Sequence, residues 1–154
     1  SSVNPGNSTG TLTVAGDLDF ASSTTAYNLE ILAQPVGFGF DVIDVTAGAV
    51  NLNSASLNVT LTTPVAKWQK LFIVVNDGGD AVSGEFNGLP NGDPFLLSLG
   101  NFASISYFGD SGSGSITGGN DIVLYDFATT IPEPASLTLL ALGGLMIGRR
   151  RRSA

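Results

Sequence analysis

Apolar and polar residues alternate in short runs along most of the chain, which is typical of half-buried β-strands. Such runs lie at residues 11–20, 27–31, 38–45 and 50–61, and glycine or proline interrupts them. No window of 11–18 residues before residue 131 carries the apolar stripe of an amphipathic helix. The pattern therefore predicts an all-β body of short strands joined by turns.

The short β units recur weakly along the chain. Residues 10–14 read Gly-x-Leu-x-Val, and residues 48–52 form a looser counterpart. Repeated units of this kind favour a solenoid, in which each turn of chain stacks on the previous one and buries a continuous apolar column. A β-sandwich of about seven strands is the competing arrangement. Periodicity alone does not separate the two.

The C-terminal residues follow a different pattern. Pro132, Glu133 and Pro134 precede a 14-residue segment, residues 135–148, that carries no charge. As a helix at about 1.5 Å per residue this segment reaches about 21 Å, which is short of a hydrocarbon core of about 30 Å. Arginine stems can snorkel and the bilayer can thin, so a strained span is feasible. The alternative is a buried helix of a soluble domain.

A basic cluster follows the apolar segment and predicts the orientation of the tail. Clustered arginines stay on the cytoplasmic side, which places residues 1–131 outside the cytoplasm. The side chains expected in the membrane are Ala135, Leu137, Leu139, Leu140, Leu142, Leu145, Met146 and Ile147. The basic stop consists of Arg149, Arg150, Arg151 and Arg152.

This order of features resembles the PEP-CTERM sorting tail of Gram-negative bacteria. In that family an exosortase reads the Pro-Glu-Pro motif, here Pro132, Glu133 and Pro134. The resemblance implies an exported protein that is held transiently in the inner membrane and is bound for the cell surface or extracellular matrix. It also implies that the tail is an address signal and that the upstream residues are the cargo.

Charge and composition exclude several classes of function. The net charge is −7, and outside the four terminal arginines Lys67 and Lys70 oppose 13 acidic residues. Such a body repels nucleic acid and anionic membrane surfaces. The chain has no histidine and no cysteine, which removes Ser-His-Asp catalysis, most zinc sites, disulfides and thiol chemistry. We expect no enzymatic activity, no cofactor and no metal site.

The chain starts with Ser-Ser-Val-Asn, without methionine or a signal peptide. Because an export tail requires an export signal, we expect a longer precursor or a signal already removed. We divide the chain into a linker at residues 1–10, β-solenoid coils at 11–66, a C-terminal coil and cap at 67–130, and the sorting tail at 131–154.

A second resemblance covers roughly residues 10–127. Residues 70–79 form a strand that enters a glycine turn, residues 82–92 read V-S-G-E-F-N-G-L-P-N-G, and residues 118–124 read G-G-N-D-I-V-L. This succession resembles the end of autotransporter-associated β-strand repeat passengers. It implies a right-handed parallel β-helix with a C-terminal β cap, from which a glycine- and serine-rich insertion at residues 110–116 departs.

The bulky side chains of the second half are predicted to form the core of this cap. They are Trp68, Leu71, Phe72, Ile73, Phe86, Phe95, Phe102 and Phe108. An alternative is that Trp68 or Tyr107 stacks on a sugar ring.

Acidic residues supply the remaining candidate chemistry. Asp17 and Asp19 share one strand face, as a glycosidase pair could, although solvated surface charge is the favoured interpretation. Aspartates in glycine-rich turns could hold Ca²⁺, with one imperfect repeat unit around Asp121.

The sequence as a whole favours a non-catalytic, exported structural protein of the cell surface or extracellular matrix. The expected partners are an exosortase-type enzyme and, through the tail, the membrane, with exopolysaccharide as a further candidate and nucleic acid excluded. The alternative is the supporting region of a polysaccharide-acting enzyme or adhesin whose active part lies upstream.

Overall fold

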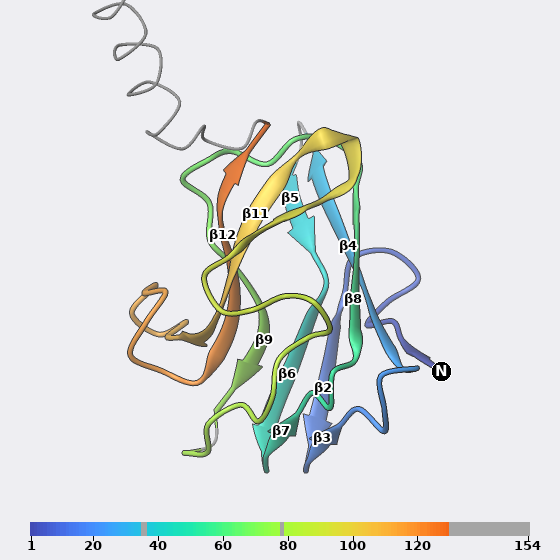
Figure 1. Ribbon diagram of the computed structural model, residues 1–154, viewed down its shortest axis with the longest axis vertical. Helices are drawn as coiled ribbons and strands as arrows, with labels where there is room; N and C mark the ends of the chain where they lie inside the picture. Colours follow the sequence, from blue (N-terminus) through green and yellow to red (C-terminus); the bar gives the residue numbers. More distant parts are fainter. Residues whose placement is uncertain (35–36, 78, 130–154) are drawn as a thin grey trace, which may run out of the picture.

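The regular structure consists almost wholly of strands, as the alternating pattern predicted (Figure 1). The computed structural model describes residues 1–34, 37–77 and 79–129. The strands are β1 (Ser2–Val3), β2 (Thr11–Ala15), β3 (Leu18–Asp19), β4 (Ala26–Gln34), β5 (Gly37–Phe40), β6 (Val42–Ala47), β7 (Val50–Asn51), β8 (Ser56–Leu61), β9 (Leu71–Asn76), β10 (Pro94–Leu96), β11 (Phe102–Gly109) and β12 (Asp121–Ala128). A 3₁₀ turn, η1 (Ser98–Gly100), connects β10 to β11.

The strands form three sheets. The largest has six strands in the order β10-β11-β12-β9-β6-β2. A four-stranded sheet has β4 at its centre, with β8 paired along β4 and with β1 and β5 paired to its two ends. β3 and β7 form a two-stranded sheet. The segment expected to be a linker contributes β1, which pairs in parallel with β4.

The prediction of a parallel β-helix solenoid is wrong. β2, β6 and β9 pair in parallel, but β9, β12, β11 and β10 pair antiparallel, so the largest sheet is mixed. β4 and β5 are also antiparallel, and the sheets do not close into a solenoid. The alternative of a β-sandwich fits these sheets. The alternation of apolar and polar side chains predicts a strand and its buried face. It does not predict strand direction, because the backbone groups at a strand edge can form hydrogen bonds with either a parallel or an antiparallel neighbour.

The parallel pairing of β2 with β6 over Thr11–Val14, and of β6 with β9, aligns residues 31 positions apart. Ile43 pairs with Leu12 on one side and with Val74 on the other. Ile43 and Val74 are fully buried, and Leu12, on the edge strand, is half-buried. A register slip of one residue would turn these side chains to the opposite face of the sheet. Burial of Ile43 and Val74 therefore fixes the register of the strands.

An aromatic cluster occupies the centre of the core. Phe86 lies within 6.2–6.4 Å, between ring centroids, of Phe20, Tyr27 and Tyr107. The Tyr27 hydroxyl donates to the backbone oxygens of Asp41 (3.2 Å) and Ile73 (3.1 Å). The cluster therefore joins segments that are far apart in the sequence.

The core predicted for the second half is correct only in part. Leu71, Ile73 and Phe86 are buried, with at most 2% of each side chain exposed. Trp68 is 77% exposed and Phe108 is 51% exposed, so the prediction that these two rings are core residues is wrong. Hydrophobicity gives the tendency to be buried, but strand pairing determines which large side chains have a neighbour to pack against.

Replacing Phe86 by alanine should destabilise the fold strongly. The change removes a buried ring that contacts three others, and large-to-small core changes of this type cost about 3–5 kcal/mol in free energy of unfolding. Urea unfolding followed by circular dichroism measures the cost. Phe108→Ala is the matched control, for which we expect less than about 1 kcal/mol because the ring is half exposed. Equal losses in the two variants would contradict this account of the core.

Candidate functional site

The predicted sorting residues all follow the last strand. β12 ends at Ala128, and the described part of the chain ends at residue 129. The sorting motif (Pro132, Glu133 and Pro134), the apolar segment and the arginine stop, together with the predicted C-terminal helix, lie outside the described residues. Within the described ranges, no helix is long and apolar enough to cross a membrane.

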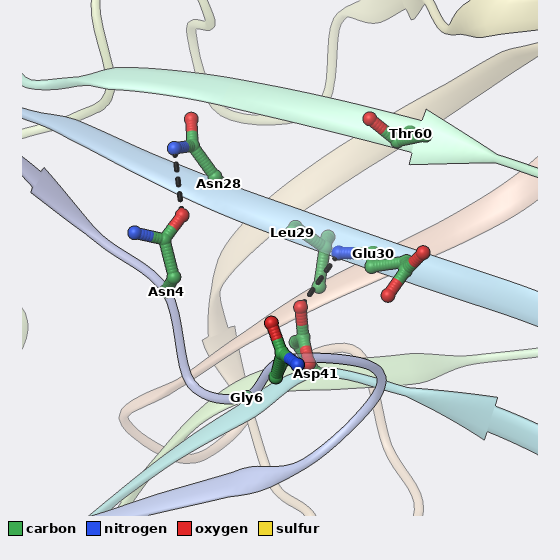
Figure 2. A pocket seen from close by; sticks show the side chains of 8 residues that line it. Asn4, Gly6, Asn28, Leu29, Glu30, Asp41 and Thr60 are labelled. Carbon is green, nitrogen blue, oxygen red and sulfur yellow. Dashed lines mark hydrogen bonds between the residues drawn. The ribbon is translucent and has the colours of Figure 1, made fainter.

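A pocket opens on the four-stranded sheet. Its volume is about 460 Å³ (Figure 2). The lining is mostly polar and comes from the segment before β2, from β4, from β8 and from the residue before β6. The lining residues are Asn4, Gly6, Asn7, Asn28, Leu29, Glu30, Asp41 and Thr60.

A ladder of asparagine side chains crosses this sheet beside the pocket. Asn58 Nδ2 donates to Asn28 Oδ1 (2.9 Å), and Asn28 Nδ2 donates to Asn4 Oδ1 (2.8 Å; Figure 2). The parallel register of β8 and β4 places Asn28 directly opposite Asn58. Each amide can donate and accept at once, so the ladder satisfies its members while they remain exposed.

Asp41 lies at the base of the pocket and holds backbone together. Its Oδ1 accepts a hydrogen bond from the Gly10 amide (2.9 Å), and its Oδ2 accepts one from the Glu30 amide (2.8 Å; Figure 2). The residue is only 3% exposed. Both oxygens are therefore used to join the segment before β2 to β4, which is the chemistry of a structural clamp.

The two aspartates considered as a glycosidase pair have separate partners. Asp17 Oδ1 accepts a hydrogen bond from the Ala49 amide (2.9 Å), and Asp19 Oδ1 accepts one from Asn53 Nδ2 (2.6 Å). Each interaction fastens the β2–β3 region to the segment that contains β7. The structure thus uses these carboxylates to hold adjacent segments in place.

The aspartates of the glycine-rich turns are only partly brought together. Asp121 is buried and accepts hydrogen bonds from the backbone amides of Asn76 (2.8 Å) and Ser111 (2.7 Å). Hydrogen bonds from the Ser113 hydroxyl and amide lower the pKa of the Asp110 carboxyl below its usual range. Across residues 1–34, 37–77 and 79–129, no group of three or more acidic side chains is placed to hold a metal ion.

Sequence reasoning did not identify the pocket on the four-stranded sheet. Its residues come from positions 4–7, 28–30, 41 and 60, which meet only through strand pairing. A signal was present, because Asn28 and Asn58 both occupy a polar position between two apolar residues of an alternating run. Reading that signal required knowledge of which strands pair.

Comparison with known proteins assigns the C-terminal residues. Residues 130–152 match the PEP-CTERM protein-sorting motif. The resemblance to a PEP-CTERM sorting tail is thereby confirmed, and the motif marks an exported protein that is targeted to an exosortase and passes the membrane to the cell surface. Searches of curated proteins and of solved structures found no match to the chain. The resemblance of residues 10–127 to autotransporter passenger ends is not supported.

Proposed function

We propose that this protein is a non-catalytic structural component of the cell surface or extracellular matrix. In this proposal an exosortase reads Pro132, Glu133 and Pro134, the apolar segment is held in the membrane, and the arginines stop its transfer. The observation that carries the proposal is the match to the sorting motif at residues 130–152, which begins two residues after β12 ends. A folded β domain followed at once by a sorting signal is the arrangement expected for an exported cargo.

The chemistry of the domain supports a structural role. The whole chain lacks histidine and cysteine, so two common catalytic side chains are missing. Asp17, Asp19 and Asp41 accept hydrogen bonds that fasten neighbouring segments. These hydrogen bonds give the three carboxylates a role in holding the fold together.

The test of this proposal is the intact mass of the protein isolated from its native cell surface. We expect a C-terminus near Pro132–Pro134, because a sorting signal is removed once it has been read. A mass that extends to Ala154 would show a retained tail and would contradict processing. The same sample, incubated with polysaccharides, should release no sugar fragments. Release would instead support a polysaccharide-acting enzyme.

A further inference from the structure

A second, smaller pocket lies beside the paired strands β9 and β12. It is formed by residues 67–70, which lead into β9, together with Ile116, Tyr125 and Asp126, and we call it the Trp68 pocket. Its volume is about 220 Å³. β9 and β12 lie side by side (Figure 1). Leu71 pairs with Leu124, which brings the segment before β9 alongside Tyr125. The pocket is below the range of about 300–1,000 Å³ for drug-sized ligands, and a single sugar ring is of suitable size.

The Trp68 pocket presents an aromatic surface to solvent. Trp68 is the only tryptophan of the chain and is 77% exposed, and Tyr125 is half-buried in the same pocket. Exposing a large indole ring forgoes the free energy gained by burying it. An exposed ring inside a concave site is instead available to stack on a flat apolar surface, such as the C–H face of a pyranose.

The lysines give this pocket a charge unlike that of the rest of the body. Apart from the four terminal arginines, Lys67 and Lys70 are the only cationic side chains of the protein, and both line the pocket. Asp126 is the acidic residue of its lining. The pocket therefore has a local positive excess in a chain of net charge −7, and this favours an anionic group on the ligand.

The polar side chains of the pocket have hydrogen-bonding capacity to spare. Lys70 Nζ donates to the Gly114 backbone oxygen (2.6 Å), which uses one of its three N–H groups and holds the β11–β12 loop near the pocket. Within the part of the chain that the structure describes, the side chains of Lys67, Tyr125 and Asp126 have no hydrogen bond or ion pair. These groups differ from Asp41 and Asp121, whose oxygens are taken by backbone amides.

A β-bulge shapes the wall that carries Asp126. Tyr125 pairs with Ser104 and Ala128 with Phe102, so two residues of β12 oppose one residue of β11. Asp126 adopts the left-handed backbone conformation, with φ of 52°. A non-glycine residue in this conformation is strained, and bulges redirect side chains near functional sites. Here the bulge lies in the wall that brings the Asp126 carboxylate into the same pocket as Trp68 and Tyr125.

We propose that the Trp68 pocket binds an acidic sugar unit, namely a uronic acid residue of an anionic polysaccharide. Trp68 stacks on the ring face, Lys67 and Lys70 attract the carboxylate, and Asp126 and Gln69 accept hydrogen bonds from hydroxyl groups. This inference rests on the proposed function, a structural component of the cell surface or extracellular matrix, and it specifies the chemistry of a partner there.

The test is a titration of the full chain with polygalacturonate as the anionic probe and dextran as the neutral one, followed by the emission of Trp68. We expect a saturable change with polygalacturonate that weakens with added salt, and no change with dextran. Equal responses to both would overturn the acidic specificity. Binding to phosphatidylglycerol vesicles without binding to polygalacturonate would overturn the proposal in favour of a lipid surface.

Variants locate the site when binding is measured on immobilised polygalacturonate. We expect Trp68→Ala to weaken binding about tenfold through lost stacking. Lys67→Gln should weaken it about threefold to fivefold, as for an exposed ion pair. Phe108→Ala, which removes another exposed ring outside the pocket, is the matched control and should leave binding unchanged. A loss in Phe108→Ala equal to that in Trp68→Ala would overturn the assignment. This assay uses purified protein, so its failure leaves sorting in cells a separate question.

Discussion

Replacing Pro132, Glu133 and Pro134 together by alanine is expected to abolish processing and surface delivery. Proline fixes its own φ near −65° and disfavours helix at the residue before it, so alanines in place of the two prolines would remove both restrictions from the motif. Glu133 supplies the acidic group between them. Without these three residues, an exosortase that reads the motif loses its substrate, and the chain should accumulate in the inner membrane with its full mass.

The matched control for this variant lies in the same tail. Thr138→Ala changes a neighbouring residue without adding charge or removing proline, and it should be processed normally. Fractionation of cells, followed by the intact mass of each fraction, measures both variants. Delivery of the triple variant in normal amount would show that these three residues do not form the signal.

The folded domain is expected to lose stability steeply above pH 10. Burial, together with the nearby Asp41 carboxylate, raises the pKa of Tyr27 far above the ordinary value, and burial also raises the pKa of Tyr107. Both phenols ionise near pH 10 in the unfolded chain but stay protonated in the folded one. The folded state therefore binds more protons, and its stability is fully present below pH 10 and falls as the pH rises.

The expected size of this effect follows from the two tyrosines. Each contributes about 1.4 kcal/mol per pH unit above pH 10, so the pair should remove about 5 kcal/mol of unfolding free energy by pH 12. Urea unfolding at several pH values, followed by circular dichroism, measures the slope. An unchanged free energy of unfolding between pH 9 and pH 12 would contradict the burial of these hydroxyls.

Tyr27→Phe separates the two contributions. The variant keeps the ring in the aromatic cluster but loses the hydrogen bonds from the hydroxyl to the backbone oxygens of Asp41 and Ile73. We expect a loss of about 1–3 kcal/mol at neutral pH, because two buried acceptors lose a donor. The alkaline slope should then fall by about half, because only Tyr107 still titrates on unfolding.

The sequence by itself determined the parts of this protein whose chemistry is local. The sorting motif is a contiguous stretch, and the order of proline, glutamate, apolar residues and arginines is visible without a fold. The all-β character could also be predicted, because apolar and polar side chains alternate along residues 27–31 with the two-residue period of a strand. Neither conclusion required knowledge of which segments meet.

Only the tertiary structure decided how the strands pair and what the polar residues do. β9 pairs in parallel with β6 on one edge and antiparallel with β12 on the other, because backbone N–H and C=O groups can form hydrogen bonds with a neighbouring strand of either direction. Asp41 became a backbone clamp and Trp68 an exposed ring because of neighbours far along the chain. The chemistry of a side chain determines which interactions it can make. Long-range packing determines which partner it meets, and therefore whether it is buried, hydrogen-bonded or exposed.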